Sequence, residues 1–205
     1  GALLDSLEAS KGGMPLPAEA IVKLIQQHLD CRGSSRLPVL VVAAAYKAAE
    51  DYLREQVSPL RSHTAADEQT GALGDLEITL TDDNEIVTSY EMKMKRVIKE
   101  DIDRAVQKIR QHGKAIDNYI FVTTDVIEEQ VREYAASMYE HTGGIEIVIL
   151  DCIGFLRHFL HLFHRLRMRF LQEYQQLVLA EPDSAVSQPL KEAFLALRQA
   201  AESGE

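Results

Sequence analysis

The sequence contains no tryptophan and only two cysteines, Cys31 and Cys152, which lie far apart in the chain. Neither a disulfide framework nor a zinc site is indicated, because the cysteines belong to no cluster with the spacing of metal ligands. No run approaches the roughly 18 uninterrupted apolar residues that a membrane helix needs, and the amino terminus lacks the order of a signal peptide. We therefore expect a cytoplasmic protein that does not associate with membranes.

Positive charge is also scarce. The 22 lysines and arginines stand against 32 acidic residues, which gives a net charge of −10. This balance counts against nucleic-acid binding, because contacts to phosphate are driven by cations. The distribution matters more than the sum, however, since two local basic tracts at 93–114 and 157–169 are compatible with DNA. The competing interpretation is that these tracts are solvated helix faces.

The composition is that of an ordinary globular protein, because 46% of the 205 residues are hydrophobic and 26% are charged. We expect a flexible leader at 1–14, an α/β core at 15–150, and a helical part at 151–205 that packs on the core or forms a dimer seam. The chain opens on Gly-Ala rather than methionine, which suggests a cleaved tag or a domain cut from a longer protein.

Helical and strand-like patterns alternate along the core. A helix between two buried strands predicts a crossover unit of the βαβ kind. The stretch 58–72 has turn formers and little periodicity, so the pattern shows no strand ahead of Asp75. We predict strands at 75–80, 86–95, 118–124 and 145–150. Helices are predicted at 18–29, 100–112, 152–179 and 187–201. Two further helices have predicted caps: one runs from Ser34 or Ser35 to about Val57, and the other from an Asp125-x-x-Glu128 cap to about His141.

The two strands at 75–80 and 86–95 form a predicted hairpin, since apolar and polar residues alternate in both with the period of a strand. The connection Thr81–Glu85 suits a three-residue turn with Asn84 in the left-handed conformation. If Thr81 is opposite Glu85, the following pairs form: Leu80 with Ile86, Ile78 with Thr88, Leu76 with Tyr90, and Asp75 with Glu91.

This register sets the carboxylates of Asp75 and Glu91 against each other, with Lys93 on the same face. Like charges opposed on neighbouring strands destabilise a sheet, so a fold that keeps them usually gains a cation between them. Mg²⁺ is commonly held by one or two carboxylates together with substrate phosphates. A lysine beside them can orient the attacking water and offset charge on a phosphate. These groups suit phosphodiester hydrolysis.

The order of Asp75, then Glu91-x-Lys93 on the next strand, then a helix and a strand, resembles the PD-(D/E)xK nuclease superfamily. The segments "HTAADEQTGALGDLEI" and "YEMKMK" look most like Type II restriction endonucleases, and the resemblance covers roughly 36–150. It implies a restriction-endonuclease-like mixed central sheet flanked by helices, with a helical carboxy-terminal extension. It also implies hydrolysis of double-stranded DNA that depends on Mg²⁺, for which Mn²⁺ can substitute, and that leaves a 5′-phosphate.

Carried over by position, the resemblance makes Asp75 and Glu91 metal ligands and Lys93 the catalytic lysine. The carbonyl of Met92 and the carboxylate of Glu50 are candidate further ligands. Two departures from the family pattern stand out. Gly74 replaces the nominal proline, and the Gln-x-x-x-Tyr arrangement of the RecB-like branch is absent, which weakens a repair-exonuclease assignment.

Five residues near the motif are candidate DNA contacts: Lys95, Arg96, Lys99, His63 and Thr64. A homodimer is expected, because cutting both strands of a symmetric site calls for two active sites. Two alternatives stay open. The chain could be a nuclease-fold module that binds DNA or supports assembly without cleavage, or a helical interaction protein in which Glu91 and Lys93 only pair on a solvated sheet face.

Overall fold

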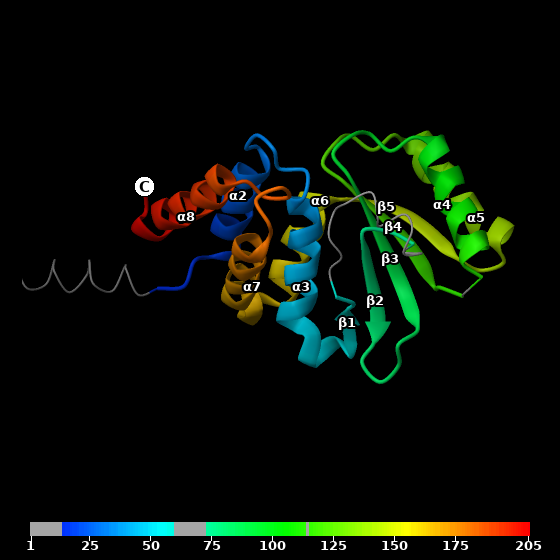
Figure 1. The fold of residues 1–205 in the computed structure, drawn as a ribbon, viewed down its shortest axis with the longest axis horizontal. Coiled ribbons are helices and arrows are strands. Elements are labelled where there is room, and N and C mark those ends of the chain that lie inside the picture. Colours follow the sequence, from blue (N-terminus) through cyan, green and yellow to red (C-terminus); the bar gives the residue numbers. More distant parts are fainter. Residues whose placement is uncertain (1–13, 60–72, 114) are drawn as a thin grey trace, which may run out of the picture. The chain divides into compact units, whose positions relative to one another are not determined.

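The computed structural model describes residues 14–59, 73–113 and 115–205 (Figure 1). The predicted leader, apart from Met14, and the candidate DNA contacts His63 and Thr64 lie outside these residues. The chain divides into two compact units. One, the helical unit, combines the described part of Gly1–Ala44 with Leu156–Glu205, and the other, the sheet unit, is the described part of Ala45–Phe155.

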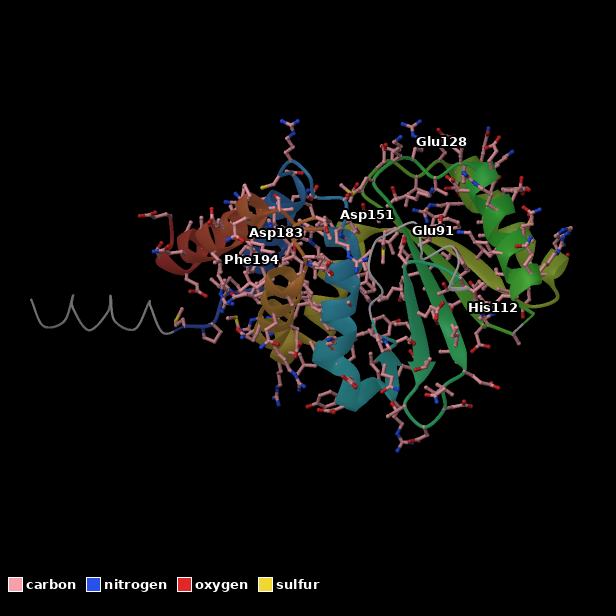
Figure 2. All side chains as sticks on the ribbon, in the orientation of Figure 1. Glu91, His112, Glu128, Asp151, Asp183 and Phe194 are labelled. Carbon is pink, nitrogen blue, oxygen red and sulfur yellow. The ribbon has the colours of Figure 1, made fainter. Side chains whose placement is uncertain are left out.

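The helical unit packs helices from both ends of the chain around an aromatic core. Helix α2 (Ala18–Leu29) has the predicted bounds, and its buried face contacts α7 (Arg167–Ala180) and α8 (Gln188–Ser203). Tyr174 of α7 and Phe194 of α8 are fully buried with ring centroids 5.3 Å apart, and Phe194 is labelled in Figure 2. The unit also holds the start of α3 (Leu37–Leu53), most of α6 (Cys152–Leu162) and the short helix η2 (His164–Leu166).

His28 is a fully buried polar residue of this unit. Its Nε2 atom donates to the carbonyl oxygen of Leu190 at 2.9 Å, so its Nδ1 atom is left to accept from the hydroxyl of Tyr174 at 2.7 Å. Burial lowers the pKa of His28, against a smaller opposing effect of the Leu190 carbonyl. The imidazole is therefore held neutral, with both nitrogens hydrogen-bonded.

The sheet unit contains a five-stranded mixed sheet in the order β1-β2-β3-β4-β5. The first three strands pair antiparallel and the last three pair parallel. Their bounds are β1 (Glu55–Val57), β2 (Leu76–Leu80), β3 (Ile86–Lys93), β4 (Asn118–Thr123) and β5 (Glu146–Asp151). With helices on the sheet and a helical carboxy-terminal part, the predicted α/β fold is confirmed. None of the described helices is long and apolar enough to cross a membrane.

Helices α4 (Lys99–His112) and α5 (Glu129–Thr142) form the two crossovers and lie together on one side of the sheet (Figure 1). The crossover through α4 was predicted from the alternation of helix and strand patterns, whereas α5 and β5 were predicted only as a helix and a strand. The apolar side chains of α4 and α5 pack on one face of the sheet in a continuous core whose largest members are Ile102, Ile109, Tyr119, Phe121 and Met138.

The prediction that the second helix runs to Val57 is wrong. Helix α3 ends at Leu53, because Arg54 takes a left-handed conformation with a φ of 54°. The next three residues form β1, in which Glu55 pairs with Leu80 and Val57 with Ile78. The strand that the sequence pattern did not show ahead of Asp75 therefore lies within the stretch assigned to the helix.

The hairpin register is confirmed near the motif and wrong at the turn. Leu76 pairs with Tyr90 and Ile78 with Thr88, as predicted. An irregularity after Ile78 then sets Thr79, rather than Leu80, opposite Ile86. Asn84 is not left-handed, since Arg54 is the sole non-glycine residue with positive φ in the part of the chain that the structure describes.

The cap predicted for α5 is also wrong. The helix starts at Glu129, after Glu128, and no side chain caps it. The Asp125 carboxylate instead accepts from the N–H of the next residue, Val126, at 2.6 Å. Gly143 ends the helix just after the predicted end near His141, with a φ of 77°.

Candidate active site

Asp75 directly precedes β2 and is bound to β3. Its N–H donates to the carbonyl oxygen of Tyr90, the residue that pairs with Leu76, at 2.8 Å. The ladder between β2 and β3 begins at this pair, so it does not include the predicted pair of Asp75 with Glu91. The carboxylate is anchored to the opposite strand as well, because Oδ2 accepts from the N–H of Met92 at 2.8 Å. Two backbone contacts to β3 thus fix the position of Asp75.

Glu91 is oriented from the sheet and from α4 (Figure 2). Its Oε1 atom accepts from the hydroxyl of Tyr119 on β4 at 2.8 Å and from Nζ of Lys108 on α4 at 3.3 Å. Burial raises the pKa of Tyr119, and the charges of Glu91 and Asp75 raise it further, so the phenol keeps its proton and donates. The hydroxyl of Tyr119 thus orients Glu91 as a hydrogen-bond donor.

Lys93 points to the same face of the sheet. Its Nζ atom lies 3.9 Å from Oε2 of Glu91 and 3.2 Å from Oδ1 of Asp101, in the first turn of α4. The side chain of Lys93 is 30% exposed and that of Glu91 15%. The structure thus places Lys93 beside Glu91 at a partly open position next to α4, and Asp75 is held against the same strand through the N–H of Met92.

Gly74 is required by the close approach of β3 to the chain just before β2. A Cβ atom at this position would lie 2.5 Å from the carbonyl oxygen of Tyr90 and 2.6 Å from Oγ of Ser89. Real Cβ atoms are essentially never found so close to such atoms. The replacement of the nominal proline by glycine at the start of the motif therefore has a steric reason.

The other candidate residues lie apart from this group or have partners of their own. Glu50 is exposed on α3 and shows no contact with Asp75 or Glu91 among the described residues. Arg96 pairs with Glu128 at 2.7 Å. The remaining candidates are Lys95, which is exposed, and Lys99, whose Nζ lies 5.5 Å from the ring centroid of Tyr134.

The residues present fit a hard divalent cation. Oδ2 of Asp75 is taken by the N–H of Met92 and Oε1 of Glu91 by Tyr119 and Lys108, so each carboxylate keeps one oxygen without a hydrogen bond within the described ranges. In the same ranges, no three side chains of His, Cys, Asp or Glu converge. Two carboxylates suit Mg²⁺, which keeps several waters and shares substrate phosphates, better than a closed zinc site.

Three residues of this site were not identified from the sequence: Tyr119, Asp101 and Lys108. Tyr119 is the polar residue of an otherwise apolar strand pattern, which is a usable signal. Asp101 and Lys108 look like ordinary helix-surface charges in the sequence, and only the packing of α4 beside β3 brings them to the site.

A mixed sheet that carries Glu91 and Lys93 on its antiparallel hairpin, with Asp75 bound to the same strand, is compatible with a nuclease domain. The family model of the SacI restriction endonuclease C-terminal domain matches residues 16–124, just over half of the chain. The chain belongs to this family of restriction endonuclease domains. The match includes Asp75, Glu91 and Lys93. No curated protein matches the chain.

Proposed function

We propose that the chain is a metal-dependent DNA endonuclease of the PD-(D/E)xK type, a restriction endonuclease or its catalytic domain. The observation that carries the proposal is that Asp75 is bound to β3 on either side of Glu91, through Tyr90 and Met92, with Nζ of Lys93 3.9 Å from Oε2 of Glu91. Membership of a restriction endonuclease domain family supports the same activity and makes double-stranded DNA the natural substrate.

In this proposal, Oδ1 of Asp75 and Oε2 of Glu91, which accept no hydrogen bond within the described ranges, would hold Mg²⁺ or Mn²⁺, and the Met92 carbonyl would be a further ligand. When bound, the ion supplies Lewis-acid stabilisation of the phosphate and a more acidic water. The chain's own groups orient the ligands, since the N–H of Met92 fixes Asp75 and the hydroxyl of Tyr119 fixes Glu91. The role of Glu50 as a ligand is not part of this proposal, because it lies apart from the pair.

Lys93 supplies a positive charge beside the reacting phosphate. Preorganised charges aimed at developing negative charge are usually the largest single contribution to catalysis, and removing one such group costs about 10²–10³ in rate. The lysine is on the same strand as Glu91, and its Nζ atom lies 3.9 Å from Oε2 of that residue. Cutting both strands of a duplex by such a site calls for a homodimer.

The test is cleavage of supercoiled plasmid in the presence of Mg²⁺. We expect the wild-type chain to nick or linearise the plasmid, and we expect Asp75→Asn, Glu91→Gln and Lys93→Met each to reduce the rate by about 100-fold or more. The matched control is Glu85→Gln, which removes one charge from the exposed turn of the same hairpin and should leave cleavage unchanged.

Full activity in Asp75→Asn and Glu91→Gln would disprove the assignment. Duplex binding by the wild-type chain without cleavage, under Mg²⁺ and Mn²⁺ alike, would instead support the alternative of a nuclease-fold module that only binds DNA.

A further inference from the structure

Asp101 is the nearest acidic partner of Lys93 and has no role assigned so far. It lies in the first turn of α4 and is 5% exposed. Its Oδ2 atom accepts from the N–H of Ile98 at 3.0 Å, which caps the helix. Its Oδ1 atom lies 3.2 Å from Nζ of Lys93 and 2.5 Å from Nη2 of Arg104. One carboxylate therefore joins the helix start, the site lysine and a surface arginine.

The cap alone does not explain this arrangement. Capping uses only one oxygen of the carboxylate, and an exposed residue can supply it. Burial of an ionised carboxylate is costly unless charged partners compensate for it. Burial raises the pKa of Asp101, but the N–H of Ile98 and the charges of Lys93 and Arg104 outweigh this effect and hold the pKa below its ordinary value. Asp101 is thus an anion at neutral pH, and Lys93 is one of the cations that keep it so.

The geometry also restrains the lysine. A lysine side chain has four rotatable bonds and loses considerable rotamer entropy when it is fixed in one geometry. Glu91 alone holds Nζ loosely, at 3.9 Å, whereas the Asp101 carboxylate is immobilised by the helix backbone and by Arg104. A rigid anchor at 3.2 Å therefore limits Nζ to the space beside Glu91.

We propose that Asp101 is a positioning residue that holds the ammonium group of Lys93 next to Glu91 in the orientation that the reaction needs. This inference rests on the proposed function. Asp101 does not touch substrate in this role and acts only through Lys93. Fixed orientation is a large source of catalytic rate, and loss of residues that orient a site typically costs about 10–100-fold in activity.

The experiment compares Asp101→Asn with the wild-type chain. An asparagine keeps the shape and an amide oxygen that accepts from Ile98, so the cap survives while the charge is lost. We expect kcat for plasmid cleavage to fall about 10–100-fold with KM changed less than about twofold. The matched control is Glu100→Gln, which removes the same charge one residue earlier from an exposed position and should leave kcat unchanged.

A second measurement reports how tightly the Lys93 side chain is held and does not depend on cleavage activity. The order parameter of the Lys93 Cε atom, measured by NMR relaxation, should lie in the rigid range in the wild-type chain and fall below about 0.6 in Asp101→Asn. Lys23, exposed on α2, is the internal reference and should not change. Unchanged order at Lys93 would overturn the inference, because Asp101 would then not be restraining it.

The outcomes separate this inference from the proposed function. Loss of cleavage in Lys93→Met together with wild-type kcat in Asp101→Asn overturns the positioning role alone. Absence of cleavage by the wild-type chain overturns the proposed function, and the order parameter then decides whether Asp101 restrains Lys93.

If Asp101→Asn does not fold, Asp101→Glu takes its place, since glutamate suits this third helical position as a cap. The longer side chain displaces the carboxylate. A reduced kcat at unchanged KM then supports the inference, and a wild-type kcat overturns it.

Discussion

Gly74→Ala tests how tightly the hairpin fixes the site. The added methyl carbon would lie 2.5 Å from the carbonyl oxygen of Tyr90, where ordinary contacts begin near 3.4 Å, so the strands must move apart by about 0.9 Å. The same carbonyl accepts from the N–H of Asp75, so the movement acts directly on the position of Asp75.

Two magnitudes follow from this shift. Overpacking of a close-packed position costs about 1–3 kcal/mol, so we expect the free energy of unfolding to fall by that amount in urea denaturation, with a Tm lower by several degrees. A misplacement of about 1 Å at a catalytic group can cost about 100-fold in rate, so plasmid cleavage should fall by roughly that factor at a temperature where the variant is folded.

The control for lost stability is Gly143→Ala, at the left-handed end of α5, where no atom lies within 4 Å. The strained φ should cost about 1 kcal/mol without changing cleavage. Adding Ser89→Ala to Gly74→Ala removes one of the two clashes and should restore only part of the stability, because the clash with the Tyr90 backbone remains. If Gly74→Ala matched the wild-type chain in both stability and rate, the steric reasoning would be refuted.

Two further predictions concern buried polar groups. Tyr119→Phe removes the hydroxyl that donates to Glu91. We expect the free energy of unfolding to fall by about 1.5–3 kcal/mol and the Mg²⁺ concentration for half-maximal cleavage to rise about tenfold. An unchanged Mg²⁺ requirement would contradict the orienting role of Tyr119. Burial lowers the pKa of His28 from its ordinary value of 6.5. Below pH 6.5 the unfolded chain therefore binds a proton that the folded chain does not. The free energy of unfolding should then fall with decreasing pH by at most about 1.4 kcal/mol per pH unit. Urea denaturation at several pH values should show this pH dependence in the wild-type chain and not in His28→Gln. The same change of unfolding free energy with pH in both proteins would contradict the role of His28.

The elements of the sheet unit could be predicted where a pattern of apolar and polar residues lies within one strand or one hairpin. Alternation in β2 and β3 located the hairpin and paired Leu76 with Tyr90. Strands β4 and β5 were evident from apolar runs, although only β4 is buried along most of its length. β1 could not be predicted, because three residues carry no periodicity and pair with β2, which lies on the far side of 58–72. The end of α3 depends on the left-handed Arg54, a conformation that arginine does not signal.

The motif residues of the candidate site could be predicted from the sequence, whereas the residues of α4 that contact them could not. Asp75, Glu91 and Lys93 follow from strand register and resemblance, since all three lie on one hairpin. Asp101 could not be linked to Lys93, because the contact exists only when α4 returns beside β3 and the first helical turn comes level with the lysine. Lys108 depends in the same way on which face of α4 packs towards Glu91.

The most direct test of the account is to locate the metal. Crystals of the wild-type chain grown with Mn²⁺ and a short duplex, measured at the manganese absorption edge, should give an anomalous peak coordinated by oxygens of both Asp75 and Glu91, and the peak should disappear in Glu91→Gln. A peak that neither carboxylate coordinates, or a peak that persists unchanged in Glu91→Gln, would contradict the claim that these two side chains form the metal site.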